Sequence, residues 1–318
     1  MSDSQQPLLS ICIPTYNRSQ YLKKTLDSII CQEEFSPDNV EIVISDNCST
    51  DDTEIVCKEY TEQYENIKYF RNTENIRDRN FPLVLSKGSG VLLKLCNDTL
   101  IFNDFSLSKL LELVVNNKKE KPVIFTSNGN CKINDKCSFT SLEDFMYNAS
   151  FWITWIGGYC IWKEHWNEFG NTEDGCKESL WQVPSLLKYI NNMKKAIICN
   201  AFLFTIQTVE KKNISYGLYK VFYINYLGFI RNYINNGISQ TCYDWLEEDL
   251  LFNFYTDWMI QYKLHNNHLE YSKSENLLLN IYNSYKNKSY YKKFKIYLYK
   301  HYLKAILKEK IKAIIKLR

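Results

Sequence analysis

The stretch LLSICIPTYNRS, residues 8–19, decides how the chain is predicted to fold. Its first seven residues form an apolar run that ends at a proline, which is the pattern of a short buried strand. Residues 15–19 follow as a polar turn, and apolar side chains then recur at helical spacing over residues 21–30. The stretch therefore predicts a strand, a turn and a helix in immediate succession.

The same succession continues along the chain. The next predicted elements are strands at 40–45, 67–70 and 91–96 and helices after residue 50 and over 81–87. Ser49 and Thr50 suit the N-cap of the helix after the second strand, and Asp51 and Asp52 suit its first turn. Strands that alternate with helices form right-handed βαβ units. The sequence therefore predicts an α/β fold built on a mostly parallel sheet with flanking helices.

The pattern changes in the rest of the chain. A helix is predicted over 106–120 and a strand over 122–125, after which the pattern is mixed up to residue 209. Beyond residue 215 the spacing is helical to the end.

Polar residues follow three of the four predicted N-terminal strands. They are Thr15, Asn17 and Arg18 after the first strand, Asp46 and Asn47 after the second, and Asn97 and Asp98 after the fourth. In open α/β sheets, ligands bind at the carboxyl ends of the strands. These loops are therefore the predicted ligand site.

Composition and charge fit a folded protein with a distinctive tail. The 318 residues are 45% hydrophobic and 24% charged, which is usual for a globular domain. The net charge of +3 conceals an asymmetry, because residues 286–318 carry +11 and the remainder −8. An acidic body with a basic tail predicts a partner for the tail.

The eleven cysteines do not predict disulfides. Cys12 and Cys96 lie inside predicted strands, no Cys-x-x-Cys pair occurs, and residues 1–7 do not form a signal peptide. We therefore expect reduced cysteines in a cytoplasmic protein. No stretch reaches 18 consecutive apolar residues, so no transmembrane helix is predicted.

Three blocks in the N-terminal third resemble the glycosyltransferases of family 2. They are ICIPTYNR at 11–18, EIVISDNCSTDDT at 41–53 and NTENIRDRN at 72–80, which come in the family's order. The resemblance covers residues 8–105 and looks closest to bacterial enzymes that build surface polysaccharides, such as abequosyltransferase-like proteins. It implies the GT-A fold, a Rossmann-like sheet that binds a nucleotide sugar. The implied parts are a nucleotide-sugar-binding half at 1–105, an acceptor-binding half at 106–214 and a helical C-terminal region at 215–318.

The resemblance also implies which residues hold the nucleotide. They are Pro14, Thr15, Asn17, Arg18, Asp46, Asn75, Arg77, Asn80, Asn97 and Asp98. Asp46 matches the acid that contacts the nucleobase in the family, although a turn residue is the alternative. Arg18 faces either the ligand or the solvent. Arg77 replaces a glycine of the family, so either the backbone is adjusted there or Arg77 itself meets phosphate.

The end of the fourth strand departs from the family pattern. Family members carry an Asp-x-Asp triplet whose last acid helps to hold a divalent cation on the pyrophosphate, whereas this chain has Asn97-Asp98-Thr99. A Thr hydroxyl is a much poorer ligand for Mg²⁺ or Mn²⁺ than a carboxylate. Asp98 can hold the metal with phosphates and water, Asp104 can substitute, or cations such as Arg77, Arg79 or Lys94 can replace the metal. Of these we favour a divalent cation at Asp98.

The catalytic base of the inverting enzymes of this fold is an Asp or Glu from the second half. This sequence offers Asp174, Glu173 and Glu178, of which Asp174 is preferred because Gly175 follows it in a loop. Each acid can equally be part of a solvated turn. In a further alternative, Trp181 and Gln182 occupy the position of the family's acidic pair, and the base is then unidentified.

Other side chains between the two halves allow two interpretations. Trp152, Trp155, Gly157, Gly158, Tyr159 and Trp162 suit either stacking on sugar rings or core packing. The four histidines, His165, His265, His268 and His301, form no recognisable metal motif.

The basic tail is predicted to be one helix from residue 291 onward. Lys300, Lys304, Lys308, Lys312 and Lys316 recur every four residues, beside an apolar row of Leu303, Leu307, Ile311 and Ile314. This composition is typical of an interfacial helix on an anionic membrane, and the alternative is a helix packed on the body with a solvated lysine face. We expect residues 289–318 to contact the inner face of the cytoplasmic membrane, and no nucleic acid to bind.

Two functions follow as hypotheses. The first is an inverting glycosyltransferase that moves a sugar from a nucleotide-sugar donor to a lipid-linked or polysaccharide acceptor in O-antigen or capsule synthesis. The second is a catalytically silent protein of the same fold that binds glycans or acts as a scaffold, which the altered triplet Asn97-Asp98-Thr99 suggests.

Overall fold

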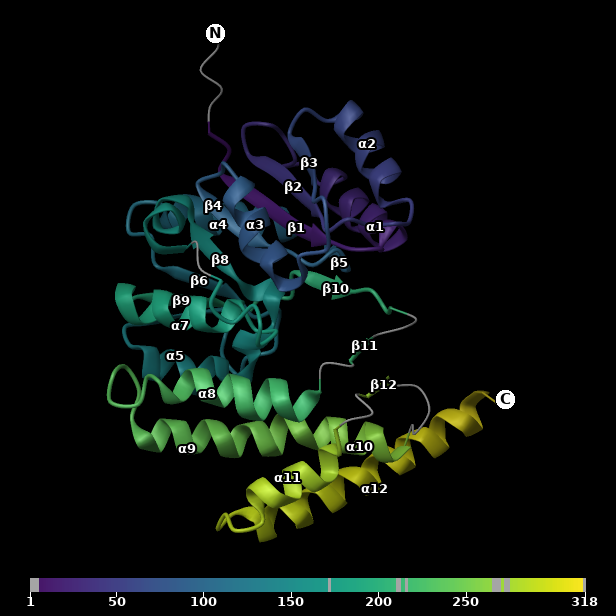
Figure 1. Cartoon of the computed structure of the whole chain (residues 1–318), viewed down its shortest axis with the longest axis vertical. Coiled ribbons are helices and arrows are strands. Elements are labelled where there is room, and N and C mark those ends of the chain that lie inside the picture. The colour runs from purple at the N-terminus through teal and green to yellow at the C-terminus, as the bar shows by residue number, and fades with distance from the viewer. Residues whose placement is uncertain are drawn as a thin grey trace. The chain divides into compact units, whose positions relative to one another are not determined.

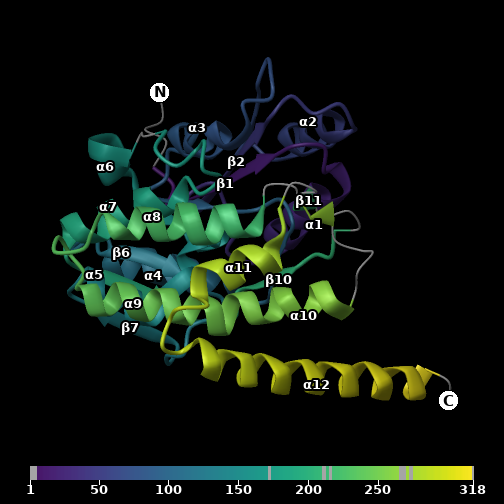
Figure 2. The same cartoon turned by 60° about the horizontal axis from the view of Figure 1, so that its bottom comes forward.

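The computed structural model describes residues 6–170, 173–209, 213–214, 217–264, 270–271 and 275–316 (Figure 1, Figure 2). The chain forms two compact units, Met1–Val209 and Glu210–Arg318, and each is described by itself. In Figure 1 the first unit runs from purple to teal and contains the main sheet, whereas the second runs from green to yellow and is mostly helical.

A five-stranded sheet organises the first unit. Its strands follow the order β3-β2-β1-β4-β8, and all neighbours are parallel except β4 and β8. They are β1 (Leu9–Thr15), β2 (Val40–Asp46), β3 (Ile67–Arg71), β4 (Leu92–Leu95) and β8 (Cys160–Trp162). β2 is buried throughout and β1 almost throughout, which is why both are nearly continuous apolar runs. The predicted α/β fold with a mostly parallel sheet is confirmed.

The connections create a switch point beside β1. The helices are α1 (Ser19–Ile30), α2 (Thr53–Gln63) and α3 (Asn80–Lys87), the last preceded by the short η1 (Arg77–Arg79). The chain steps from β1 to β2 and β3 on one side, and then returns to β4 on the other side of β1. Right-handed crossovers therefore place α1 and α2 on one face and α3 on the other. In such sheets the crevice lies at the reversal, here at the carboxyl ends of β1 and β4.

The remainder of the first unit extends this frame. A second sheet has the order β6-β9-β7, and β5 pairs with β10 as an antiparallel ribbon. The strands are β5 (Leu100–Phe102), β6 (Val123–Thr126), β7 (Lys136–Phe139), β9 (Ala196–Cys199) and β10 (Phe204–Ile206). The helices are α4 (Ser106–Asn117), α5 (Leu142–Ala149), η2 (Ser150–Thr154), η3 (Ile156–Gly158), α6 (Lys163–His165), η4 (Trp166–Gly170) and α7 (Gln182–Met193).

The second unit is built from helices around a buried carboxylate. They are η5 (Tyr219–Tyr226), α8 (Leu227–Arg231), α9 (Gln240–Asp249), η6 (Leu250–Tyr255), α10 (Thr256–Leu264), α11 (Leu277–Tyr285) and α12 (Tyr291–Lys316), with a two-residue pairing of β11 (Asn213–Ile214) and β12 (Glu270–Tyr271). Glu247 is buried and accepts hydrogen bonds from Tyr223, Lys288 and Tyr290. These contacts satisfy its charge among packed aromatic rings.

Two expectations from the sequence need correction. α2 begins at Thr53, so Ser49 and Thr50 are not its caps; Asp51 instead accepts a hydrogen bond from the backbone N–H of Thr53. The cause is that Ser49 and Thr50 bond the first loop, so the chain turns later than the pattern indicates. The region between residues 126 and 209 also contains four strands that the sequence pattern does not predict. β7, β8, β9 and β10 are only three or four residues long, which is too short for a clear pattern.

All eleven cysteines lie in described parts of the chain and are free thiols, as predicted. Within the described residues, no helix has the length and apolar character needed to cross a membrane.

A buried carboxylate fixes the amino-terminal edge of the sheet. Glu41 of β2 accepts hydrogen bonds from Lys68 Nζ at 2.7 Å, from the hydroxyl of Ser10, and from the backbone and side chain of Ser89. Burial raises the pKa of the Glu41 carboxyl, but the bonds from Lys68, Ser10 and Ser89 outweigh burial and hold the pKa below its ordinary range. The turn before β4 is tied to β1 and β2 in this way, and Gly90 is needed because a Cβ there would lie 2.6 Å from the Ser10 backbone nitrogen.

We predict that Glu41→Gln lowers the free energy of unfolding at pH 7 by about 1.5–3 kcal/mol, the usual value for hydrogen bonds to a charged group. Because the folded-state pKa is lowered, Glu41 stabilises the fold above its unfolded pKa, and the contribution is lost as the pH falls through the folded pKa. Urea unfolding at pH 7 and near pH 3.5 measures both effects. Equal differences between wild type and variant at the two pH values would contradict the assignment.

Candidate functional site

The first loop and the end of β4 are joined by an ion pair across the switch point. Arg18 donates from its NH1 to Asp98 Oδ1 at 2.9 Å, and the hydroxyl of Thr15 donates to Oδ2 at 2.9 Å. The backbone carbonyl of Asp98 accepts from Thr25 on α1. Each Asp98 carboxylate oxygen therefore has a donor from the first loop.

The pair is electrically asymmetric. The Asp98 side chain is 4% exposed and the Arg18 side chain 44% exposed. Burial raises the pKa of the Asp98 carboxyl, and the Arg18 charge with the Thr15 hydroxyl partly offsets that rise. The carboxylate faces the protein, whereas the guanidinium reaches solvent.

The second loop is bonded to the first. The backbone N–H of Asn17 donates to Ser49 Oγ at 2.9 Å, and Asn17 Oδ1 accepts from the backbone N–H of Thr50 at 2.7 Å. Asp51 accepts from the backbone N–H of Ser19 at the start of α1. Asn17 has a φ of 52°, a left-handed conformation that Asn tolerates better than most residues. Its side chain therefore fixes the loops to each other.

Asp46 is buried at the end of β2. Its carboxylate accepts from the Ser49 backbone N–H at 2.8 Å, the Tyr69 hydroxyl at 2.8 Å and Arg71 NH1 at 3.2 Å. The contact with Ser49 is that of a turn residue, the alternative role considered from the sequence. A nucleobase contact through these oxygens requires an exchange of partners and stays a prediction.

The third loop is anchored through asparagine side chains. Asn47 donates to Asn75 Oδ1 at 2.8 Å and accepts from the backbone N–H of Ile76. Asn80 is buried, donates to the Ser45 carbonyl at 2.9 Å and accepts from Asn72. The Asn80 amide is thus satisfied within the protein, which gives it a positioning role.

Arg77 stands at the position where the resemblance predicts a glycine. Its φ is 53°, so the backbone keeps the left-handed conformation that a glycine adopts freely. Its side chain is exposed. The positive φ is compatible with a position that suits glycine, and a phosphate contact stays a prediction.

The residues around the triplet do not fit a divalent cation. Asp98 supplies the only carboxylate of Asn97-Asp98-Thr99, and both of its oxygens are bonded to the first loop, one of them to a positive charge. Asp104 is exposed in the turn before α4. Among the described residues, no three His, Cys, Asp or Glu side chains gather as metal ligands do.

Lys94 cannot serve as a phosphate-binding cation, which corrects that alternative. It is fully buried on β4, where its Nζ donates to the Gly157 carbonyl at 2.6 Å and to the Thr126 hydroxyl at 3.0 Å. The ammonium also lies 5.0 Å from the centre of the Phe204 ring. Lys94 therefore holds the segment around Gly157 against the sheet.

The aromatic cluster divides between core and surface. Tyr159 and Trp162 are buried, and their polar atoms bond Ser185 and the Pro122 carbonyl. Trp152 and Trp155 are half-buried and remain candidates for contact with a sugar ring. A Cβ at Gly158 would lie 2.3 Å from the Phe125 ring and one at Gly157 2.7 Å from the Trp155 ring, so both glycines serve close packing.

The predicted catalytic acids lie in a turn beside the third loop. Burial is the main cause that raises the pKa of the Cys176 thiol to about 12, and the nearby carboxylates of Asp78, Glu173 and Glu178 contribute to that rise, which Arg79 opposes. Burial also raises the pKa of Asp78 to about 6, although Arg77 opposes the shift. Two of the predicted acids are therefore grouped with a carboxyl that the sequence did not single out.

The remaining residues predicted from the sequence lie in the turn before α7, at the start of α7 and at the strand ends. Asp174 is exposed and Gly175 has a φ of 83°. Trp181 and Gln182 are buried at the start of α7, where Gln182 bonds the Thr154 carbonyl. Pro14 and Asn97 are half-buried at the strand ends.

The histidines are scattered. His165 is buried and bonds the Tyr189 hydroxyl, and His301 stacks on Tyr297. His265 and His268 lie outside the described residues.

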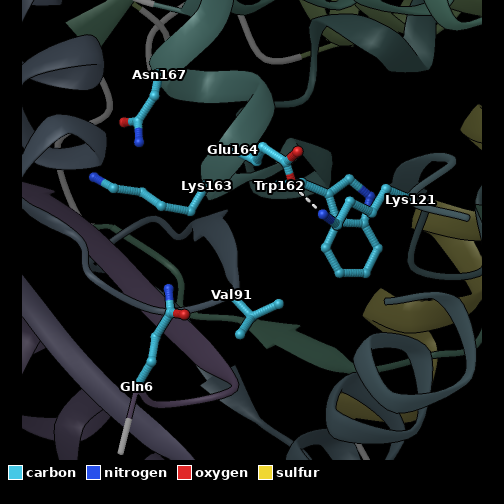
Figure 3. Close-up of a pocket in the computed structure, with 7 residues that line it drawn as sticks. All are labelled: Gln6, Val91, Lys121, Trp162, Lys163, Glu164 and Asn167. Atoms are coloured by element: carbon cyan, nitrogen blue, oxygen red, sulfur yellow. Dashed lines mark hydrogen bonds and ion pairs between the residues drawn. The ribbon is translucent and has the colours of Figure 1, made fainter. Parts of the chain in front are cut away.

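A pocket of about 290 Å³ lies away from these loops (Figure 3). Its lining includes Gln6 and Val91, which precede β1 and β4, so it opens at the amino-terminal edge of the sheet. Figure 3 shows the ion pair of Lys121 and Glu164 beside the Trp162 indole. The pocket is therefore separate from the candidate site.

Comparison with known proteins gives three results on sequence. Residues 10–167 match the model of the family described as glycosyl transferase family 2. The abequosyltransferase RfbV of Salmonella typhimurium is 48% identical over 85 residues, which cover 26% of this chain and 25% of that protein. The GalNAc(5)-diNAcBac-PP-undecaprenol beta-1,3-glucosyltransferase of Campylobacter jejuni is 41% identical over 66 residues, which cover 21% and 20%. The chain thus matches a quarter or less of the length of these two relatives.

Solved structures resemble the chain in fold. TarS 1-349 of S. aureus superposes with a TM-score of 0.56 at 16% identity, over 82% of this chain and 75% of that one. The mannosyltransferase PcManGT of Pyrobaculum calidifontis, in complex with GDP-Man and Mn²⁺, superposes with a TM-score of 0.55 at 15% identity, over 93% and 86%.

We predict that Arg77→Gly raises the free energy of unfolding by about 0.5–1 kcal/mol, because glycine removes the steric cost of the left-handed backbone. Arg79→Gly is the matched control, since Arg79 has a φ of −62° beside α3 and gains nothing from glycine. Thermal unfolding of both variants measures the difference. A loss of stability in Arg77→Gly equal to that in Arg79→Gly would refute it.

Proposed function

We propose that this chain, whose residues 10–167 match the model of glycosyl transferase family 2, is an inverting glycosyltransferase of bacterial surface polysaccharide synthesis. It takes a sugar from a nucleotide-sugar donor and transfers it to a lipid-linked or polysaccharide acceptor. The bond of Arg18 and Asp98 across the switch point carries the proposal, because it places a solvent-facing guanidinium where open α/β sheets bind their ligands.

The four polar loops support donor binding. They meet at one edge of the sheet and are bonded to each other, so a nucleotide finds donors and acceptors already in position. The structural relatives include TarS with UDP and with UDP-GlcNAc, and PcManGT with GDP-Man. We propose a nucleotide sugar as donor on this basis.

The acceptor and the base are proposed from the second half of the first unit. An inverting transfer is a single displacement in which a carboxylate, acting as general base, takes the proton of the acceptor hydroxyl. Asp174, Glu173 and Glu178 are the candidates, and the half-buried Trp152 and Trp155 offer faces for sugar rings. The curated relative from Campylobacter jejuni, with an undecaprenol-linked glycan in its name, supports a lipid-linked acceptor.

The divalent cation predicted at Asp98 stays a prediction. It is supported by the Mn²⁺ in the PcManGT structure. Because the side chains around Asp98 do not fit a cation, we derive no step of the transfer from one.

We predict that Asp98→Asn lowers turnover of the donor at least about 100-fold, because the first loop loses the charge that fixes Arg18 and Thr15. Turnover of a panel of UDP, GDP and CDP sugars measures this, with circular dichroism as the test of folding. Asp38→Asn, an exposed acid before β2, is the matched control.

Turnover by Asp98→Asn within threefold of the wild type would exclude the proposed site. A wild-type protein that neither binds nor turns over any of these nucleotides would favour the silent, glycan-binding alternative.

We further propose that α12 rests on an anionic membrane at the inner face of the cytoplasmic membrane. Ile296, Tyr299, Leu303, Leu307 and Ile311 are three or four residues apart, so they form one row along the helix, and each is 47–62% exposed. Exposed Lys300, Lys304 and Lys308 run beside this row. Apolar side chains next to lysines fit the boundary between anionic headgroups and acyl chains.

We predict that the triple change of Lys300, Lys304 and Lys308 to Glu weakens binding to vesicles with anionic lipid at least about tenfold, since each lysine contributes about 1 kcal/mol. Flotation with phosphatidylglycerol vesicles measures it, and the same change at exposed Lys23, Lys118 and Lys119 is the control. Equal flotation of both variants, or of vesicles without anionic lipid, would refute the membrane proposal.

A further inference from the structure

We infer that the Arg18 guanidinium is the cation that binds the diphosphate of the donor, so that this chain holds its nucleotide without a divalent metal ion. The inference deepens the proposed function and rests on it. It concerns one side chain of the first loop and the single carboxylate of the altered triplet.

The carboxylate already has a cation. Arg18 NH1 lies 2.9 Å from Asp98 Oδ1, and the Thr15 hydroxyl takes Oδ2. A divalent ion at Asp98 would have to displace the guanidinium or lie against its positive charge. Thr99 cannot compensate, because its hydroxyl is a weak ligand and no second carboxylate stands beside it.

Arg18 keeps enough free donors for a phosphate. A guanidinium carries five N–H donors in a rigid fork, and among the described residues only NH1 has a recorded side-chain acceptor. The side chain is 44% exposed, and its backbone carbonyl is fixed by the first turn of α1. The remaining edge of the fork matches two phosphate oxygens, so one arginine can bridge the carboxylate and the diphosphate.

The other cations considered from the sequence are less suited. Lys94 is buried and bonded to Gly157 and Thr126. Arg77 and Arg79 lie in η1, where the Arg77 carbonyl is 3.4 Å from Asn47 Nδ2 of the loop after β2, and no contact joins either side chain to Asp98 among the described residues. Arg18 alone among these adjoins Asp98 at the switch point.

The charge is needed when the donor bond breaks. The oxygen of the acceptor hydroxyl forms a bond to the anomeric carbon. The proton of that hydroxyl passes to a carboxylate side chain. The bond from the anomeric carbon to the phosphate oxygen breaks, and its electron pair stays on that oxygen. The leaving diphosphate gains one negative charge, which a prepositioned guanidinium stabilises.

The test is calorimetry with UDP, GDP and CDP, in EDTA and in Mn²⁺. We expect the wild-type Kd for the diphosphate that binds to agree within about twofold in the two conditions. We expect Arg18→Gln to weaken the binding of that diphosphate at least about tenfold, which is the loss expected for a charge-assisted hydrogen bond. The affinity for the corresponding nucleoside should stay unchanged. Lys24→Gln, which removes an exposed charge from α1, is the matched control and binds as the wild type does.

Arg18→Lys keeps the charge opposite Asp98 and loses the fork, so it tests for misfolding; it should bind the diphosphate with intermediate affinity. Diphosphate binding that requires Mn²⁺, or Arg18→Gln with wild-type affinity, overturns the inference. Metal-free diphosphate binding without turnover of any of the sugars leaves the inference intact and refutes the transferase. Failure of every diphosphate to bind in both conditions refutes both.

Discussion

The arrangement of the candidate site depends on one ion pair that joins two strands far apart in sequence. Arg18 and Asp98 are 80 residues apart, and they meet because the chain reverses direction across the sheet between β3 and β4. That reversal leaves β1 and β4 adjacent with their carboxyl ends uncovered by a crossover. The pair joins the loops that follow β1 and β4. The backbone carbonyl of Asp98 also accepts a hydrogen bond from the Thr25 hydroxyl on α1, and that hydroxyl accepts one from the Gln207 side chain. Together with the bond from Thr15 to Oδ2, the pair fixes the first loop against the end of β4.

Around this pair, the loops form a continuous hydrogen-bonded rim. Asn17 bonds the second loop, Asn47 bonds the second loop to the third, and Asn80 returns the third loop to β2. Three residues of these loops, Asn17, Cys48 and Arg77, adopt left-handed backbone conformations, which cost energy outside glycine and persist where neighbouring contacts enforce them. The strain and the bonds together indicate loops that are positioned before a ligand arrives, which reduces the entropy that binding has to overcome.

The sequence predicted the frame of the site and only part of its content. Mostly apolar runs identified β1, β2 and β4 because central parallel strands are buried on both faces, and the polar residues after them lie together at the carboxyl ends of these strands. The inward turn of Asp46 and Asn80 was not predictable, because their partners Tyr69, Arg71 and Ser45 come from neighbouring strands. The raised pKa of Asp78 was not predictable for the same reason, because it arises from burial in the folded chain. Local patterns specify elements, whereas the partners of a polar group are fixed by tertiary contacts.

The departures from the family pattern act in one electrostatic direction. By the resemblance to family 2, Asn97 and Thr99 stand where carboxylates are expected and Arg77 where a glycine is expected, so each difference makes these loops more positive by one charge. The backbone at Arg77 has a positive φ, a conformation that glycine adopts freely, and its side chain adds a charge to the third loop. A diphosphate carries two or more negative charges, which a divalent cation normally neutralises. In the proposed role of Arg18, this compensation comes from its solvent-facing guanidinium, whose carboxylate partner Asp98 is buried.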